Sequence, residues 1–81
     1  MTFVEFFDKS PIENIISAFA VRPEKIVFIG ESKMMKKPIP VYQKFFQEKG
    51  LSVQLEMCPV NKNDLWDIVK KLSAIVEREA I

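Results

Sequence analysis

With 81 residues, the chain is long enough for one small domain, and its 48% content of apolar residues excludes a disordered protein. The formal net charge of +1 excludes a general electrostatic attraction to nucleic acid or to membranes. The lack of His and the single cysteine, Cys58, exclude His-based acid–base catalysis, most zinc sites and an intrachain disulfide. No signal-peptide pattern is present and no apolar run approaches the ~20 residues that span a bilayer, so we expect a cytoplasmic protein.

The first predicted elements are a strand and a helix. Residues Thr2–Phe7 are mostly β-branched or aromatic, which is typical of a strand. Ser10, Pro11 and Glu13 have the spacing of a helix N-terminus with a capping box. This helix should end at residues 20–22, before Pro23. Its apolar stripe is expected to comprise Ile12, Ile15, Ile16 and Phe19.

The next predicted strand is the unbroken apolar run Ile26–Ile29, which ends at Gly30 and indicates a central strand covered on both faces. Ser32 is expected to cap a short helical piece or irregular turn over Lys33–Lys37. A helix should then run from Ile39 or Pro40 to Lys49, with Gly50 as the residue that ends it. Its buried stripe is expected to comprise Val41, Tyr42, Phe45 and Phe46.

The last two predicted elements are a half-exposed strand and a long helix. Ser52–Pro59 alternates apolar and polar residues, as an edge strand does, and places Cys58 on the polar or helix-covered side, where we expect it to be inert. Residues Asn61–Asp64 should cap the helix, and Trp66 should lie at the periphery of the core. The helix carries an apolar stripe at helical spacing: Leu65, Ile68, Val69, Leu72, Ile75 and Val76.

The order βαβαβα predicts an α/β fold with a three-stranded parallel sheet of strand order 3-2-1, a partial Rossmann-like domain. The first strand would then keep an open apolar edge. Pairing with a second copy or further chain beyond Ile81 would cover it. We favour the second explanation and expect residues 1–81 to be a single N-terminal domain of a longer protein.

Ligands of open parallel sheets bind at the carboxyl ends of the strands, and three loops should meet there. Their lysines, Lys9, Lys33 and Lys62, suit a phosphate-bearing ligand. Ordinary caps and turns would use the same residue types, and no dinucleotide fingerprint or P-loop is present. The predicted ligand-binding residues are Asp8, Lys9, Ser10, Gly30, Ser32, Lys33 and Asn61.

Two weaker hypotheses use the same region. Glu31 and Lys33 match part of a metal-dependent nuclease motif, with Asp8 as a second acid. The basic cluster of Lys33, Lys36 and Lys37 could contact DNA, although a solvated turn is the simpler interpretation, so we expect no direct nucleic-acid contact.

Three strings resemble the N-terminus of the uncharacterised bacterial family that includes the Card-type CRISPR-associated endonucleases. They are VEFFDKSPIENI (Val4–Ile15), RPEKIVFIGESKMMKK (Arg22–Lys37) and VNKNDLWDIVKKL (Val60–Leu72). The resemblance implies the first part of a CARF (CRISPR-associated Rossmann fold) domain, a fold that dimerises and binds cyclic oligoadenylate across the dimer. A metal-dependent nuclease domain follows in such proteins, and its catalytic residues have no counterpart here.

These patterns together lead us to expect a non-catalytic nucleotide-sensing module without metal or other cofactor. It would act as a homodimer, bind a ligand such as cyclic oligoadenylate and regulate an attached nuclease in antiviral defence. The alternative is a structural dimerisation domain without a small-molecule ligand. An enzyme in which Asp8 and Glu31 bind a metal is the third hypothesis.

Overall fold

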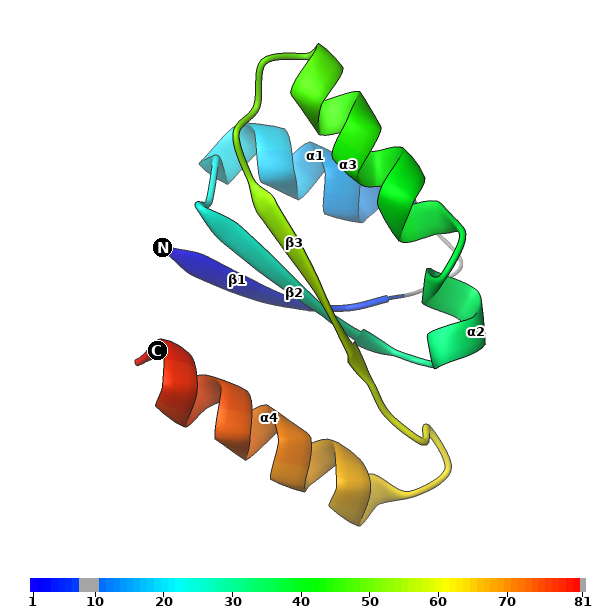
Figure 1. Cartoon of the computed structure of the whole chain (residues 1–81). Coiled ribbons are helices and arrows are strands. Elements are labelled where there is room, and N and C mark those ends of the chain that lie inside the picture. The colour runs from blue at the N-terminus through cyan, green and yellow to red at the C-terminus, as the bar shows by residue number, and fades with distance from the viewer. Residues whose placement is uncertain (8–10, 81) are drawn as a thin grey trace.

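The computed structural model describes residues 1–7 and 11–80, and it confirms the predicted α/β class (Figure 1). Three parallel strands form one sheet in which the second strand lies between the other two. The elements, in chain order, are β1 (Thr2–Phe6), α1 (Pro11–Val21), β2 (Lys25–Gly30), α2 (Ser32–Met35), α3 (Pro38–Glu48), β3 (Gln54–Pro59) and α4 (Leu65–Glu79).

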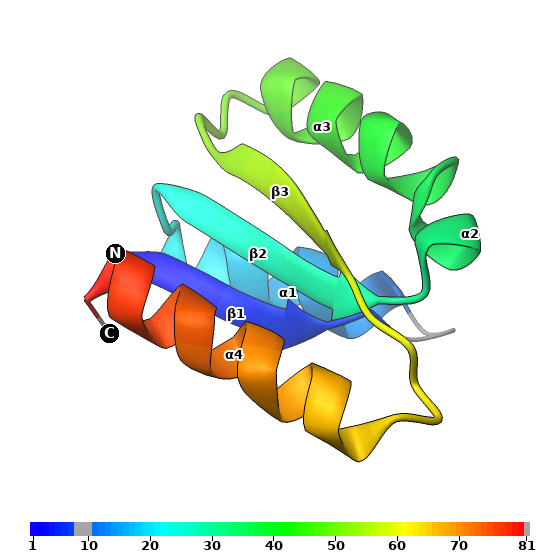
Figure 2. The same cartoon turned by 60° about the horizontal axis from the view of Figure 1, so that its bottom comes forward.

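The helices cover the sheet unequally. Figures 1 and 2 show α1 and α3 on one face and α4 alone on the other, with α2 beyond the carboxyl end of β2. Since β2 is covered on both faces, the side chains of its central residues, 26–29, are fully buried. The unbroken apolar pattern of this strand therefore reflects its central place, as predicted.

Two apolar clusters hold the layers together. The larger one lies between the sheet and α1, α2 and α3, and is centred on Phe28, Tyr42 and Phe46. The smaller one lies between the other face of the sheet and α4. It joins Val27 and Ile29 to Ile75 of α4, and Cys58 packs against it. Cys58 thus faces the covering helix, which was one of its two expected positions.

Several expected core positions are wrong. Val41 is 64% exposed, and Ile39 takes its place in the core, because α3 begins at Pro38 and turns residues 39, 42 and 46 toward the sheet. Helix α4 rests on one face of a narrow sheet, which buries only part of its broad apolar stripe. The expected core residues that are instead exposed are Ile16, Leu65, Trp66, Val69 and Val76.

The predicted element ends need smaller corrections. Glu31, with an extended backbone, occupies the N-cap position of α2, so Ser32 is the first helical residue and not the cap. Strand β3 begins at Gln54, two residues later than expected, although the preceding Val53 is buried in the larger cluster. Asp64 is the actual cap of α4, and its carboxylate accepts a hydrogen bond from the Asp67 N–H.

Gly50 ends α3 in a left-handed conformation with φ of 77°. The Leu51 N–H donates to the Phe46 carbonyl at 2.8 Å and the Gly50 N–H to the Gln47 carbonyl at 3.1 Å, which is the Schellman arrangement. A Cβ at Gly50 would meet no atom within 4 Å, so only the backbone conformation opposes a side chain there.

We therefore predict that Gly50→Ala lowers the free energy of unfolding by about 1 kcal/mol. Urea unfolding followed by circular dichroism measures this loss. Gly50→Asn, which tolerates the left-handed region better, should lose less stability than Gly50→Ala. Equal losses in the two variants would contradict the conformational explanation.

Candidate functional site

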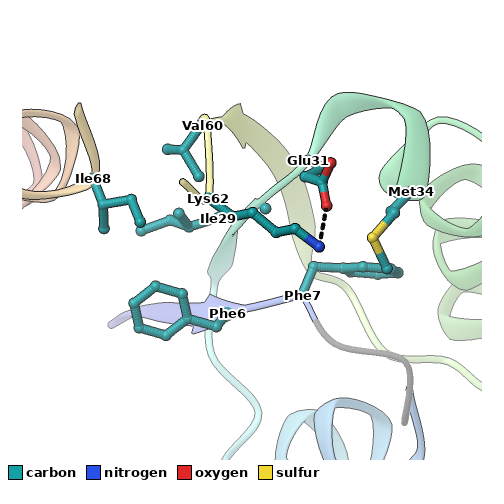
Figure 3. Close-up of a pocket in the computed structure, with 9 residues that line it drawn as sticks. Phe6, Phe7, Ile29, Glu31, Met34, Val60, Lys62 and Ile68 are labelled. Carbon is teal, nitrogen blue, oxygen red and sulfur yellow. Dashed lines mark ion pairs between the residues drawn. The ribbon is translucent and has the colours of Figure 1, made fainter. Parts of the chain in front are cut away.

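A pocket of about 220 Å³ lies at the carboxyl edge of the sheet, where ligands of open parallel sheets bind (Figure 3). The ends of β1 and β2, the start of α2 and the loop between β3 and α4 surround it. The described residues that line it are Phe6, Phe7, Ile29, Gly30, Glu31, Met34, Val60, Lys62 and Ile68.

Backbone hydrogen bonds hold the pocket floor in place. The Phe7 N–H donates to the Ile29 carbonyl at 2.8 Å, and the Val60 N–H donates to the Gly30 carbonyl at 2.9 Å. Both bonds continue the sheet one residue past the strand ends. A Cβ on Gly30 would lie 3.1 Å from the Phe7 Cβ, so glycine allows the two strand ends to approach closely.

The two consecutive phenylalanines at the end of β1 have different surroundings because successive side chains point to opposite faces of a strand. The Phe7 ring packs edge-on against Phe28, with centroids 5.7 Å apart, and also contacts Tyr42. Phe6 points to the α4 face and remains 61% exposed. The pocket therefore has two aromatic walls: Phe7 is held by its packing, and Phe6 is exposed, so that a ligand can cover it.

Among the described residues, one ion pair lies across the pocket. Lys62 Nζ lies 3.1 Å from Glu31 Oε1, and Figure 3 shows the two side chains meeting above the apolar lining. The Lys62 side chain is 66% exposed, whereas that of Glu31 is 23% exposed. Because the Lys62 end of the pair is exposed, its Nζ is accessible to an anion, whereas the Glu31 carboxylate is largely covered by the protein.

Only some of the predicted site residues lie at the pocket. Gly30 lines the pocket, while Ser32 and Lys33 are exposed on α2 and do not line it. The Asn61 amide oxygen accepts a hydrogen bond from the Asn63 N–H, and its own N–H donates to Asp67 Oδ2, so Asn61 shapes the turn before α4. The remaining three, Asp8, Lys9 and Ser10, lie outside the described residues.

The pocket also contains residues that the predicted list omits. Lys62, and not Lys33, is the described lysine that reaches it, because the loop after β3 turns back toward α2. Phe6 and Phe7 looked like ordinary strand residues, and Met34 like part of a turn. The pair of aromatic residues directly before a predicted loop was the one signal that could have indicated a pocket wall.

A second, more open groove of about 400 Å³ lies between β3 and α4. It contains Cys58, whose pKa is raised by burial, so its thiol is a poor nucleophile at neutral pH. Lys71 and Arg78 on its rim already have partners in the protein. Lys71 donates to the Pro59 carbonyl, and Arg78 forms an ion pair with Glu56. The described residues that line this groove therefore offer no reactive group.

At the opposite end of the sheet, a charged cluster joins the C-terminal end of α4 to the strands. Glu79 Oε2 lies 2.9 Å from Lys25 Nζ and 2.8 Å from Arg78 Nε, and the Thr2 hydroxyl donates to Glu79 Oε1 at 3.0 Å. Hydrogen bonds from Lys25, Arg78 and Thr2 lower the Glu79 pKa to about 2. Every member of the cluster has a partner within it, so its role is structural.

Within residues 1–7 and 11–80 no group of three or more acidic or Cys side chains is placed to hold a metal ion. The described helices include none that is long and apolar enough to cross a membrane. No family model, no curated protein and no solved structure matches this chain. The resemblance to CARF domains therefore stays a prediction.

Proposed function

We propose that the chain is a non-catalytic module that binds a phosphate-bearing nucleotide in the pocket at the carboxyl edge of the sheet. The observation that supports this best is that an exposed aromatic ring, Phe6, and an exposed cation, Lys62, line the same pocket. A nucleotide offers a flat base and an anionic phosphate, which are the complements of these two groups.

In the proposed binding mode a base lies against Phe6 and a phosphate binds Lys62. The phosphate competes with Glu31 for Lys62, whose exposed side chain is accessible to it. The pocket is small, so it takes one nucleotide unit and leaves the rest of a larger ligand, such as a cyclic oligoadenylate, outside it.

The proposed role of binding is regulation. Glu31 belongs to the β2–α2 connection and Lys62 to the β3–α4 connection, so a ligand that separates the pair moves two loops relative to each other. In line with the resemblance, this movement in a homodimer would control an attached nuclease in CRISPR-type antiviral defence. A second candidate function, a dimerisation domain without a ligand, is favoured by the exposed apolar residues of α4.

Calorimetric titration with cyclic tetra-adenylate tests the pocket. We expect Lys62→Met to weaken binding by about 10- to 100-fold, which corresponds to the loss of one charge-assisted hydrogen bond of about 1.5–3 kcal/mol. Glu31→Gln removes the competing carboxylate and should strengthen binding by up to about fivefold.

The matched control is Lys70→Met, which removes the same charge from an exposed position of α4 outside the pocket lining. It should leave the affinity unchanged. The proposal is wrong if wild-type protein shows no binding, or if Lys62→Met and Lys70→Met weaken it equally.

A further inference from the structure

Strand β1 lies at the edge of the sheet and, within the described residues, is hydrogen-bonded to a neighbouring strand on one side only. The Phe7 N–H points toward β2, where it donates to Ile29. Donors of a parallel strand alternate in direction, so the N–H groups of Val4 and Phe6 point to the free side. Such an edge is a template for pairing with another strand.

A band of exposed apolar residues on α4 lies beside this edge. Lys71, Ala74 and Arg78 face the groove along β3, which identifies that flank of the helix. The positions on the opposite flank therefore lie on the β1 side. This apolar band consists of Leu65, Trp66, Val69 and Val76, all of them exposed.

Phe6 connects the band to the strand. Val4 packs in the cluster below the sheet and the Thr2 hydroxyl bonds to Glu79, so the alternate residues 2, 4 and 6 face α4. The edge of β1 and the flank of α4 thus form one continuous surface that combines free backbone groups with apolar side chains. A partner must supply a strand edge and an apolar helix flank on the same side of the sheet.

Of the two covers that the sequence allows for the β1 edge, we propose here the one not favoured there: a second copy of this chain covers this surface, with the two β1 strands paired antiparallel about a two-fold axis. The chain itself carries both features that the partner must supply, and a two-fold axis presents each feature of one copy to the same feature of the other. The pairing joins two three-stranded sheets into one sheet of six strands and leaves no open β1 edge.

The width of the paired sheet sets the distance between the two α4 helices in this arrangement. Helix α4 packs mainly on Val27 and Ile29 of β2, and the two β2 strands of the dimer are three strand spacings apart, about 14 Å. Two helices in direct contact lie 8–10 Å apart. In this arrangement the apolar bands of the two copies face each other across this wider gap.

The charge of Glu5 selects the register. A dimer centred on Glu5 would place two carboxylates directly opposite each other, which is unfavourable. Glu5 Oε2 is already buried without a hydrogen-bond partner among the described residues, and burial raises the pKa of this carboxyl group. Centring on Val4 avoids the clash: the two Val4 residues exchange hydrogen bonds, and each Glu5 lies opposite a Phe3.

Sedimentation equilibrium at about 100 µM, without nucleotide, tests the association. We expect wild-type protein to have twice the 9.4 kDa mass of one chain. Val69→Glu places a charge in the apolar band and should give a monomer. Val41→Glu changes an exposed apolar position on α3, at the other face of the sheet, and should remain a dimer. Circular dichroism confirms that each variant is folded.

Residue-resolved amide exchange by NMR tests the pairing itself. The Val4 and Phe6 amides should be protected in wild-type protein, exchange at least tenfold faster in Val69→Glu, and lose protection on dilution. A monomeric wild type with unprotected Val4 and Phe6 amides would overturn the proposal, as would a dimer that only Val41→Glu dissociates. Because no nucleotide is present, neither result depends on the proposed function of the pocket.

Discussion

Replacing Phe28 by Ala is expected to lower the free energy of unfolding by about 3–5 kcal/mol. Phe28 is fully buried at the centre of β2, and its ring packs edge-on against Phe7 and Tyr42 at centroid distances of 5.7 and 6.2 Å. Its removal leaves a cavity between the sheet and α3 that neighbouring aromatic rings cannot fill without leaving their own contacts. Small domains have a total stability of about 5–15 kcal/mol, so this loss is a large part of the whole.

Urea unfolding measures this loss, with Val41→Ala as the control. Val41 is an apolar residue on the exposed side of α3, and its truncation should change the stability by less than about 0.5 kcal/mol. A Phe28→Ala variant that loses less than 1 kcal/mol would show that the larger apolar cluster is not tightly packed around this ring.

Acid should destabilise the protein between pH 4.5 and pH 2 through Glu79. Hydrogen bonds from Lys25, Arg78 and Thr2 lower the Glu79 pKa from 4.5 to about 2 in the folded state. A carboxyl group with a lowered pKa contributes stability above its unfolded pKa and loses it as the pH falls toward its folded pKa. The contribution of Glu79 is therefore complete above about pH 4.5 and absent below about pH 2.

The variant Glu79→Gln tests this contribution. It should lower the melting temperature at neutral pH and show a weaker dependence of that temperature on pH than the wild type over the same window. Glu77→Gln removes the same charge from the same helix, at an exposed position, and should keep the wild-type dependence. Identical pH profiles for Glu79→Gln and wild type would show that the charged cluster does not stabilise the fold.

Other carboxyl groups of the cluster still make the melting temperature of the Glu79→Gln variant depend on pH. Burial tends to raise the pKa of Glu56, but hydrogen bonds from Arg78 and Lys25 outweigh it, and the pKa is lowered. Glu56 therefore also loses stabilising interactions as the pH falls. Since Lys25 and Arg78 pair with both carboxylates, the Glu79→Gln profile reports the loss of Glu79 together with its effect on Glu56.

The candidate site was only partly predictable from the sequence. The rule that ligands bind at the carboxyl ends of parallel strands predicted the edge of the sheet at which the pocket lies, and Gly30 lines this pocket. The sequence did not indicate which lysine lies at the pocket: Lys33 is exposed on α2 outside the pocket lining, whereas Lys62 lines the pocket. The direction of a long side chain depends on how its loop folds back, and no local pattern encodes that.

By itself the sequence determined the type and order of the elements, the parallel sheet, the central place of β2 and the end of α3 at Gly50. Each of these follows from interactions between residues close in the chain, or from the handedness of the connections, and so leaves a local pattern. Only the tertiary structure decided that Val41 and Val69 are exposed, that Lys62 meets Glu31, and that Glu79 joins Lys25. These features depend on how far a neighbouring element extends over a helix and on which distant side chains it brings within reach, and both are properties of the packed whole.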